Sequence, residues 1–393
     1  MSADICIHNA VVFNGYSMMK NCAVLIRNDK IVDVFNEERF LQKKFSENTR
    51  FIDAKGCSIA PGFIDTHIHG FGGYGTEDCL VKSILKMSEG LAKWGVTSFI
   101  PTLYSEKKDK MIRGIRAIVE AMGKETGAKI LGIHLEGPFI SPDRLGVQSP
   151  DTISPVDLNL MEELWQASEG HIINMTLAPE IKNMRELALY CISKGIVMQA
   201  GHTNATYKQM IEGMQARIMH VTHLFNAMSR MHHRDPGAVG AVFIHPELSC
   251  EIIADGIHID SEIIKFLLTC KSLDKVVLVT DALKPTKQKH GPLLANGEEV
   301  YLDKCFYRKS DNVIAGSALT MIDSVKNIVS YGFRLEEAIH MASTNPARIM
   351  RQDNLGVIAP GYDADLVMLS DKLKVKYTII KGKIYEKGKL VCA

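Results

Sequence analysis

Eight apolar runs alternate with helical patterns through the middle of this 393-residue chain. Each run is largely apolar rather than apolar at every second position, which is typical of parallel strands buried on both faces. Between the runs, apolar residues recur with helical spacing, as in Ile84, Met87 and Leu91. This alternation predicts a parallel sheet covered by helices. The predicted strands are residues 59–64, 96–100, 129–135, 172–177, 196–200, 217–222, 250–254 and 275–279.

Eight such strands are the number that closes a (β/α)8 barrel, whereas a doubly wound open sheet is the alternative. An open sheet usually carries a G-x-G-x-x-G turn after its first strand, and the sequence has none there. We therefore expect an α/β fold built on a TIM-like barrel. Among its helices, the spacing of Ile263, Phe266 and Leu267 predicts that these three side chains face the sheet.

The two ends of the chain have a different pattern, with short apolar strands joined by turns. Residues 5–34 contain four such strands, and residues 365–385 contain three more. Neither end has enough strands for a sheet pair of its own, and chain termini often lie close together. We predict one small β-sandwich made of residues 1–58 and 359–393, with the barrel over residues 59–358.

The composition argues against nucleic acid and membrane partners and favours a protein with reduced thiols in the cytoplasm. A formal net charge of +1 gives no electrostatic case for nucleic acid or a membrane surface. No apolar run approaches the roughly 18 residues of a membrane span, and the first residues do not resemble a signal peptide. The nine cysteines are scattered without a C-x-x-C, which favours reduced thiols over a disulfide scaffold or a cysteine zinc cluster.

Ionisable side chains follow five of the predicted strands, at the end where a barrel gathers its loops around one cavity. Two of them are paired, because residues i and i+2 of an extended chain project to the same face. The residues are His67, His69, Glu136, His202, His223 and Asp281. Any one of these alone is commonly structural, but histidine and carboxylate together are ligands for divalent ions such as zinc and iron. Their coincidence predicts a metal site.

This constellation resembles the amidohydrolase superfamily, whose members carry His-x-His on strand one, a bridging acid on strand three or four, histidines on strands five and six, and Asp on strand eight. Residues 134–139 (HLEGPF), 201–203 (GHT), 223–228 (HLFNAM) and 255–258 (DGIH) resemble more closely one of its families, the N-acetylglucosamine-6-phosphate deacetylases. The resemblance covers nearly the whole chain. It implies the same barrel, with a β-sandwich built from both ends.

The resemblance also implies how the metal ligands are divided. One divalent ion, most simply zinc or iron, would be held by Glu136, His202 and His223. A second position would be formed by His67, His69 and Asp281, with Glu136 able to bridge. Some deacetylases of this family have Gln and Asn in place of the strand-one histidines and use a single ion, so either one or two ions are compatible with the pattern.

The reaction implied is hydrolysis of the acetamide of N-acetyl-D-glucosamine 6-phosphate to D-glucosamine 6-phosphate and acetate, in amino sugar catabolism and recycling. A bound ion would lower the pKa of a water to near ~7. Asp281 would take the proton of that water and pass it to the departing amine. Two alternatives stay open, namely another amidohydrolase such as a deaminase or cyclic-amide hydrolase, and a scaffold that has lost catalysis.

Contacts to the sugar phosphate are implied for five residues. His258 resembles the substrate-contacting histidine of strand seven. Arg234 resembles the phosphate-binding arginine, whose fork suits phosphate and which in the family can reach the neighbouring subunit, so a homodimer is implied. The backbone near Asn226 and Ala227 resembles the rest of that subsite, and Gln148 stands where many members have a histidine that contacts the amide region.

Two departures leave the exact N-acetylhexosamine phosphate open. Gln148 can donate a hydrogen bond but cannot carry the charge of a histidine. Residues 283–290 (LKPTKQKH) replace the Ala, Thr and Gly-rich loop that usually follows the strand-eight aspartate. We expect this basic loop to lie beside the site.

Overall fold

The computed structural model describes residues 4–392, and its main body is a closed barrel of eight parallel strands. In order around the barrel they are β6 (Phe63–Ile68), β9 (Val96–Leu103), β11 (Ile133–Glu136), β12 (Ile172–Leu177), β13 (Val197–Ala200), β14 (His220–Val221), β15 (Ser249–Ile253) and β16 (Val276–Val279). The short strand β10 (Lys129–Ile130) lies beside β9. The barrel closes through a parallel bridge between Ile68 and Ala282, which confirms the predicted TIM-like architecture.

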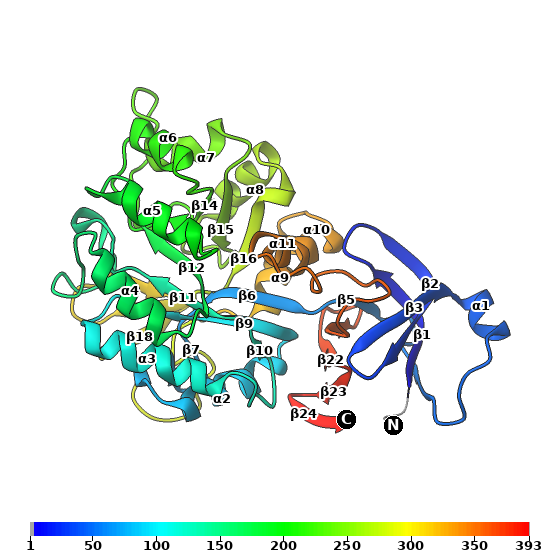
Figure 1. Ribbon diagram of the computed structural model, residues 1–393. Coiled ribbons are helices and arrows are strands. Elements are labelled where there is room, and N and C mark those ends of the chain that lie inside the picture. Colours follow the sequence, from blue (N-terminus) through cyan, green and yellow to red (C-terminus); the bar gives the residue numbers. More distant parts are fainter. Residues whose placement is uncertain (1–3, 393) are drawn as a thin grey trace.

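Helices cover the outside of the barrel (Figure 1). They are α2 (Val81–Ala92), α3 (Lys108–Ala121), α4 (Leu158–Ala167), α5 (Met184–Ser193), α6 (Tyr207–Gln215), α7 (Gly237–Ile244), α8 (Ser261–Cys270), α9 (Met321–Ser330), α10 (Leu335–Ile339) and α11 (Asn345–Ile349). A π-helical turn, His340–Thr344, joins the last two. The barrel side of α2 is formed by Ile84, Met87 and Leu91, all buried as their spacing predicts.

The predicted packing face of α8 is wrong by one position. Ile263 and Phe266 are 42% and 49% exposed, whereas the helix buries Ile264, Leu267 and Leu268. Instead of facing the sheet, Phe266 packs sideways on Phe243 of α7, with ring centroids 5.3 Å apart. Because Ile263 and Ile264 are equally apolar, the sequence pattern could not tell which of the two adjacent faces is buried.

Both ends of the chain build a second sheet at one end of the barrel (Figure 1). Its strands are β1 (Ile5–Phe13), β2 (Met18–Arg27), β3 (Lys30–Asn36), β4 (Arg50–Asp53), β5 (Ser58–Pro61), β21 (Leu366–Leu369), β22 (Val375–Ile380), β23 (Lys383–Glu386) and β24 (Lys389–Cys392). The two segments join where β5 pairs antiparallel with β21. Side chains from both, including Ile7, Val24, Ile379 and Ile384, form one buried core. The predicted β-sandwich is therefore confirmed, and helix α1 (Glu37–Gln42) lies beside it.

The apolar run predicted as one strand over residues 59–64 is in fact two strands. The first, β5, belongs to the small sheet, and the second, β6, opens the barrel. Gly62 lies between them, and its backbone passes so close to β9 that a Cβ there would be 2.1 Å from Thr97 Cγ2. Only glycine fits at this junction between the two parts of the fold.

A small antiparallel sheet between β16 and α9 was not predicted. It consists of β17 (Leu294–Ala295), β18 (Glu298–Asp303), β19 (Cys305–Arg308) and β20 (Ile314–Gly316). Its inner side packs on Tyr104 and Leu283 through Val300 and Phe306. A hairpin of β7 (Gly70–Phe71) and β8 (Tyr74–Gly75) follows β6, and single 3-10 turns occur at Thr76–Asp78, Pro142–Arg144 and Leu273–Lys275. These insertions all lie on loops of the barrel.

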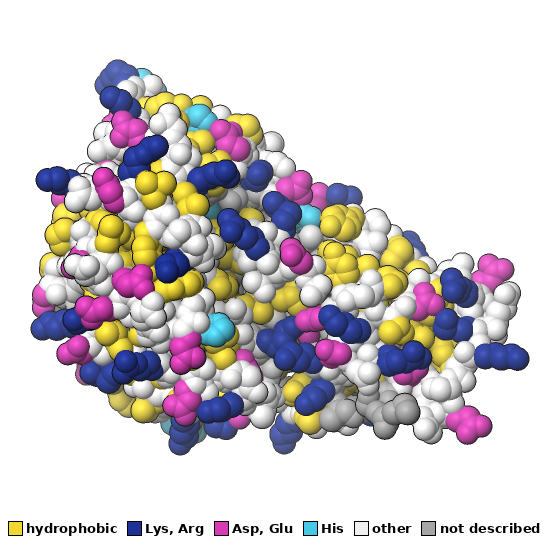
Figure 2. All heavy atoms as spheres, viewed as in Figure 1, with side chains coloured by type: hydrophobic (Ala, Val, Ile, Leu, Met, Phe, Trp, Pro, Cys, Tyr) yellow, Lys and Arg dark blue, Asp and Glu magenta, His cyan; other side chains and the backbone are white. Residues whose placement is uncertain are grey.

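The surface carries charges of both signs. On the face drawn in Figure 2, basic and acidic side chains are interspersed, in keeping with a formal net charge of +1. Within residues 4–392, no helix has the length and apolar character needed to cross a membrane.

Candidate metal centre and active site

A cavity of about 270 Å³ opens where the barrel strands end. The predicted site residues that line it are His69, Glu136, Gln148, His202, His223, Asn226, Ala227, His258 and Asp281. His67 lies directly beneath, in contact with Glu136. The structure thus brings all six predicted metal ligands and four of the five predicted substrate contacts to one place.

Glu136, His202 and His223 form the first of two clusters. The Nε2 atoms of both histidines lie 3.1 Å from Oε1 of Glu136, and they are 3.2 Å from each other. Two nitrogens bound to one zinc ion at about 2.0–2.1 Å in tetrahedral geometry would lie about 3.3 Å apart. The spacing of these atoms therefore fits a cation held between them.

The second cluster consists of His67, His69 and Asp281. Nε2 of His69 is 3.4 Å from Oδ1 of Asp281 and 3.4 Å from Oε2 of Glu136. Nε2 of His67 is 3.7 Å from the same Asp281 oxygen. This Nε2 is buried and has no hydrogen-bond partner among the described residues. Glu136 faces both clusters, as a bridging ligand must.

The electrostatics of the second cluster favour a positive charge. Burial alone would lower the pKa of His67, but the carboxylates of Glu251 and Glu136 outweigh it and raise that pKa well above its ordinary value. Burial is likewise outweighed at His69, where Asp281 and Glu136 raise the pKa. A metal ion placed here would supply the positive charge that protons on His67 and His69 otherwise supply. The donor set and its charge thus fit a divalent cation.

Hydrogen bonds on the far side of two imidazoles fix their tautomers. Nδ1 of His202 donates to the Arg144 carbonyl at 2.9 Å, and Nδ1 of His67 donates to Oε2 of Glu251 at 3.0 Å. A carbonyl or carboxylate oxygen can only accept, so each Nδ1 carries a hydrogen and each Nε2 is the nitrogen left to bind a metal ion in the clusters.

Three of the six candidate ligands have left-handed backbone conformations. The φ angles are +46° at His202, +27° at His223 and +47° at Asp281. Such conformations cost free energy for residues other than glycine, and they concentrate at functional sites. Each of these residues lies two positions beyond the end of a barrel strand, so the sharp turn of the backbone aims its side chain into the cavity.

Polar side chains around the cavity are already oriented. Nδ1 of His258 lies 2.6 Å from Oδ2 of Asp255. The side-chain amide of Gln148 donates to Oε2 of Glu136 at 2.8 Å, while its oxygen accepts from the Ser105 N–H at 3.1 Å. Gln148 therefore holds the bridging carboxylate as well as lining the cavity.

Arg234 is the predicted site residue that the structure leaves outside the cavity of its own chain. It belongs to an exposed segment, residues 230–235, and its guanidinium lies 2.7 Å from Nε2 of His233. The basic loop over residues 283–290 also directs its lysines elsewhere. Lys284 pairs with Asp78 at 2.5 Å, and Lys287 lies 3.5 Å from Asp323.

Two residues that contact the predicted ligands were missed from the sequence. The Tyr104 ring stacks on His69, with centroids 3.8 Å apart and an interplanar angle of 8°. Glu251 is fully buried and binds His67. Both had a signal in the sequence, because Tyr104 immediately follows a strand and Glu251 is the one charged residue in the run Ser249–Ile253.

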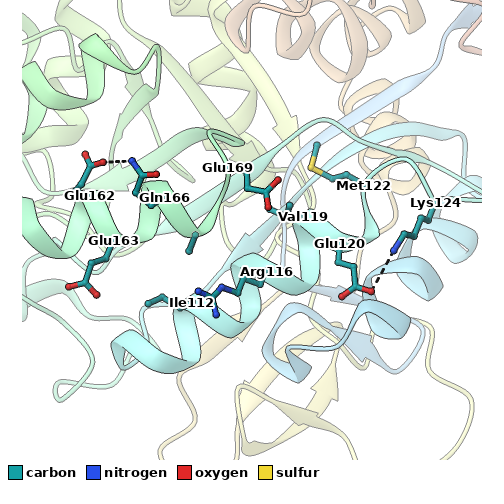
Figure 3. Close-up of a pocket in the computed structure, with 11 residues that line it drawn as sticks. Ile112, Arg116, Val119, Glu120, Met122, Lys124, Glu162, Glu163, Gln166 and Glu169 are labelled. Atoms are coloured by element: carbon teal, nitrogen blue, oxygen red, sulfur yellow. Dashed lines mark hydrogen bonds and ion pairs between the residues drawn. The ribbon is translucent and has the colours of Figure 1, made fainter.

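A larger hollow of about 830 Å³ lies between α3 and α4, on the outside of the barrel (Figure 3). Two of its acidic side chains have partners within the hollow, since Lys124 lies 3.5 Å from Glu120 and Gln166 donates to Glu162 at 2.5 Å. The candidate metal-ligand clusters of the described residues lie elsewhere. The chemistry therefore belongs to the smaller cavity in the barrel.

Comparison with known proteins agrees with this geometry. The sequence pattern of the Amidohydrolase family matches residues 58–385. The chain belongs to the amidohydrolase family. This amidohydrolase is 33% identical over 392 residues to the N-acetylglucosamine-6-phosphate deacetylase of Bacillus subtilis, with 98% of each chain covered. It is 30% identical over 329 residues to the N-acetylgalactosamine-6-phosphate deacetylase of Escherichia coli O157:H7, covering 83% of this chain and 87% of that one.

The barrel and the small sheet also match a solved structure as one unit. The crystal structure of N-acetylglucosamine-6-phosphate deacetylase from Pasteurella multocida is similar to this amidohydrolase with a TM-score of 0.90 and 30% sequence identity. The match covers 98% of this chain and 100% of that chain. The likeness therefore includes the small sheet built from both ends of the chain.

Proposed function

We propose that this amidohydrolase hydrolyses the acetamide of N-acetyl-D-glucosamine 6-phosphate, releasing acetate and D-glucosamine 6-phosphate in the catabolism and recycling of amino sugars. The observation that carries the proposal is the convergence of two ligand clusters on Glu136 in one cavity. It is supported by similarity, over 98% of each chain, to a deacetylase of this sugar phosphate. In this reaction the amide bond of the acetamide is broken, and the sugar leaves with a free amine.

The metal is proposed to be zinc or iron, with one or two ions per subunit. Imidazole and carboxylate ligands suit both metals. When bound, a divalent ion supplies Lewis acidity, which lowers the pKa of a water to about 7 and polarises the amide carbonyl. The first ion would be held by Glu136, His202 and His223, and the second by His67, His69 and Asp281.

Asp281 is proposed to move the proton. Burial alone would raise the pKa of Asp281, but the hydrogen bond from His69 and the charges of His67 and His69 outweigh it, so the pKa lies below its ordinary value. The carboxylate is therefore ionised at neutral pH and can accept the proton of the attacking water. It then returns that proton to the sugar nitrogen, which leaves as an amine because an amide anion is a poor leaving group.

His258 and Gln148 are proposed to hold the sugar and its acetamide. The bond from His258 to Asp255 fixes the imidazole, so Nε2 is the nitrogen free to meet a substrate group. Gln148 keeps Glu136 in place through its amide hydrogen. Asn226 and Ala227 line the same cavity and form the start of the phosphate subsite.

Arg234 is proposed to complete the phosphate subsite of a neighbouring subunit in a homodimer. The segment that carries it, residues 230–235, is exposed. It follows closely after Asn226 and Ala227, which line the cavity. A guanidinium can bind phosphate through two parallel hydrogen bonds. We further place the enzyme in the cytoplasm, where thiols stay reduced, since the eight cysteines among residues 4–391 are free.

The proposal is tested by acetate release from the phosphorylated and unphosphorylated sugar, with N-acetyl-D-galactosamine 6-phosphate as a third substrate. We expect wild-type enzyme loaded with metal to prefer N-acetyl-D-glucosamine 6-phosphate. Arg234→Ala should reduce this preference chiefly by raising KM, since the phosphate is remote from the reacting bond. Arg185→Ala, an exposed arginine on α5, is the matched control.

Three outcomes would contradict parts of the proposal. Equal kcat/KM on the phosphorylated and unphosphorylated sugars would remove the phosphate subsite. No acetate from any of the three substrates, with metal shown to be bound, would remove the deacetylase function. Faster reaction of the galactosamine derivative would reassign the sugar.

A further inference from the structure

Glu251 lies inside the barrel, one layer below the metal clusters. Its side chain is fully buried on β15, where its neighbours in the strand are Cys250 and Ile252. Burying a carboxylate away from water is strongly unfavourable unless its oxygens are hydrogen-bonded or paired with charge. A carboxylate in this position therefore requires specific partners.

The partners of Glu251 come from the strands that carry the metal ligands. Oε2 accepts from Nδ1 of His67 at 3.0 Å and faces the backbone N–H of His223 at 3.4 Å. Oε1 faces Oγ1 of Thr66 at 3.5 Å and Nε2 of His220 at 3.8 Å. The shortest of these contacts is the one to His67.

We propose that Glu251 is the positioning residue that creates the second metal position, by fixing the tautomer and the ring orientation of His67. The inference rests on the metal dependence proposed above. His67 reaches the clusters only through Nε2, so Nδ1 must carry the hydrogen. Glu251 is the acceptor that holds that hydrogen. In the other neutral tautomer, an N–H would point at the metal position and exclude the ion.

The first metal position does not depend on Glu251 in the same way. His202 has its own anchor in the Arg144 carbonyl. The ring of His223 meets Glu136 through Nε2, while only its backbone N–H faces Glu251. Loss of the Glu251 carboxylate should therefore weaken metal binding at the second position while the first stays filled.

The experiment counts metal ions rather than product. Wild type, Glu251→Gln, Glu251→Ala and His67→Gln are purified, stripped, titrated with Co²⁺, and assayed for bound metal by elemental analysis. We expect wild type to bind two ions and both Glu251 variants to keep the first. Outer-shell partners typically contribute 10–100-fold in metal affinity, so binding of the second ion should weaken by about that factor. Glu251→Gln is close to isosteric and keeps an acceptor oxygen without the charge. It should therefore weaken the second ion less than Glu251→Ala does, and it serves if the alanine variant does not fold.

A double mutant separates positioning from a general effect of lost charge. In a His67→Gln background, Glu251→Gln should change the metal count no further, because its target imidazole is gone. Asp65→Asn is the matched control. Asp65 is an equally buried carboxylate that accepts from Thr280 and, at 3.5 Å, from the backbone N–H of His67, but bonds to no imidazole ring. It should leave both ions bound.

Four results would overturn the inference. They are a single ion in wild type, an unchanged second ion in both Glu251 variants, equal loss in Asp65→Asn, and an added effect in the His67→Gln background. None of these readings needs substrate. Failure to release acetate would therefore count against the proposed function alone, and an unaltered metal count would count against the role of Glu251 alone.

Discussion

The two candidate metal clusters share one carboxylate, and that sharing sets how single residues contribute. Oε1 of Glu136 contacts His202 and His223 at 3.1 Å and His67 at 3.4 Å. The pKa of Glu136 lies well below its ordinary value, since the nearby histidines outweigh the effect of burial. The carboxylate is thus ionised and able to act as a ligand at neutral pH. The other residues of the two clusters are proposed either to hold metal or, in the case of Asp281, to move a proton.

Asp281→Asn separates these two tasks. An amide oxygen can still face His69 but cannot take a proton, so we expect kcat to fall by about 10²–10⁴-fold. The measurement is acetate release, with bound metal determined on the same sample. A kcat within tenfold of wild type would show that another group is the base.

His67→Gln combined with His69→Asn should leave the first ion bound. The first cluster is held together by Nε2 contacts among Glu136, His202 and His223, none of which involves the replaced rings. Elemental analysis of the purified double variant should find about one ion per chain. Loss of all metal would show that the ligands are divided differently.

At the level of elements, the junction of β5 and β6 positions His67 and His69. The chain leaves the small sheet at Pro61 and enters the barrel at Phe63, so Gly62 alone spans the change of sheet. Any displacement of this residue is passed along β6 to the two histidines at its end. The close approach to Thr97 makes the position intolerant of a side chain.

Gly62→Ala is expected to reduce the free energy of unfolding by about 1–3 kcal/mol, as overpacking of a filled core does. Gly123→Asn is the control, because φ is +79° there, no atom lies within 4 Å of the place that a Cβ would take, and Asn tolerates this conformation. It should change stability by about 0.5 kcal/mol or less. Urea unfolding measures both, and equal stabilities would contradict the steric argument.

The elements also show where sequence patterns suffice. The strand β12 was predicted at its observed bounds because a strand buried on both faces is largely apolar, here with Asn174 and Thr176 as the exceptions. The same rule predicted β5 and the start of β6 as one strand, because both are apolar and a single glycine separates them. The sheet over residues 294–316 was missed because β18 is largely exposed and has no apolar periodicity. Ligands were predictable from their place after strands, whereas Glu251 acts from within one.

On the scale of the whole molecule, buried ion pairs tie the barrel to the small sheet. Lys129 of β10 binds Asp365 and lies 3.0 Å from Asp363, just before β21. Lys30 of β3 reaches Asp363 from the other side at 2.6 Å. Burial raises the pKa of Asp365 even though Lys129 opposes it. The carboxylate therefore depends on this lysine to remain charged.

Lys129→Met should lower the free energy of unfolding by about 3–5 kcal/mol, because a buried carboxylate loses its partner. The loss depends on pH. Without Lys129 the folded-state pKa of Asp365 rises further above its unfolded value, so its contribution to stability is present at low pH and lost as pH rises through the folded pKa. We expect a larger deficit at about pH 8 than at about pH 5 in urea unfolding.

Lys30→Met is the comparison for that experiment. Its side chain is 39% exposed and pairs only with Asp363 among the described acids, so the loss should be about 1 kcal/mol or less and nearly independent of pH. A deficit in Lys129→Met that did not grow with pH would contradict the role assigned to Asp365.

The pairing of β5 with β21 also has a consequence for synthesis. Pro61 pairs with Leu366, which leaves the ribosome roughly 300 residues later, or about 15–60 s at ordinary rates of translation. Until then β5 is paired with β1 on one side only and offers an open edge to other nascent chains. A chain stalled before Leu366 keeps that edge, so the small sheet can close only after the whole barrel has been translated.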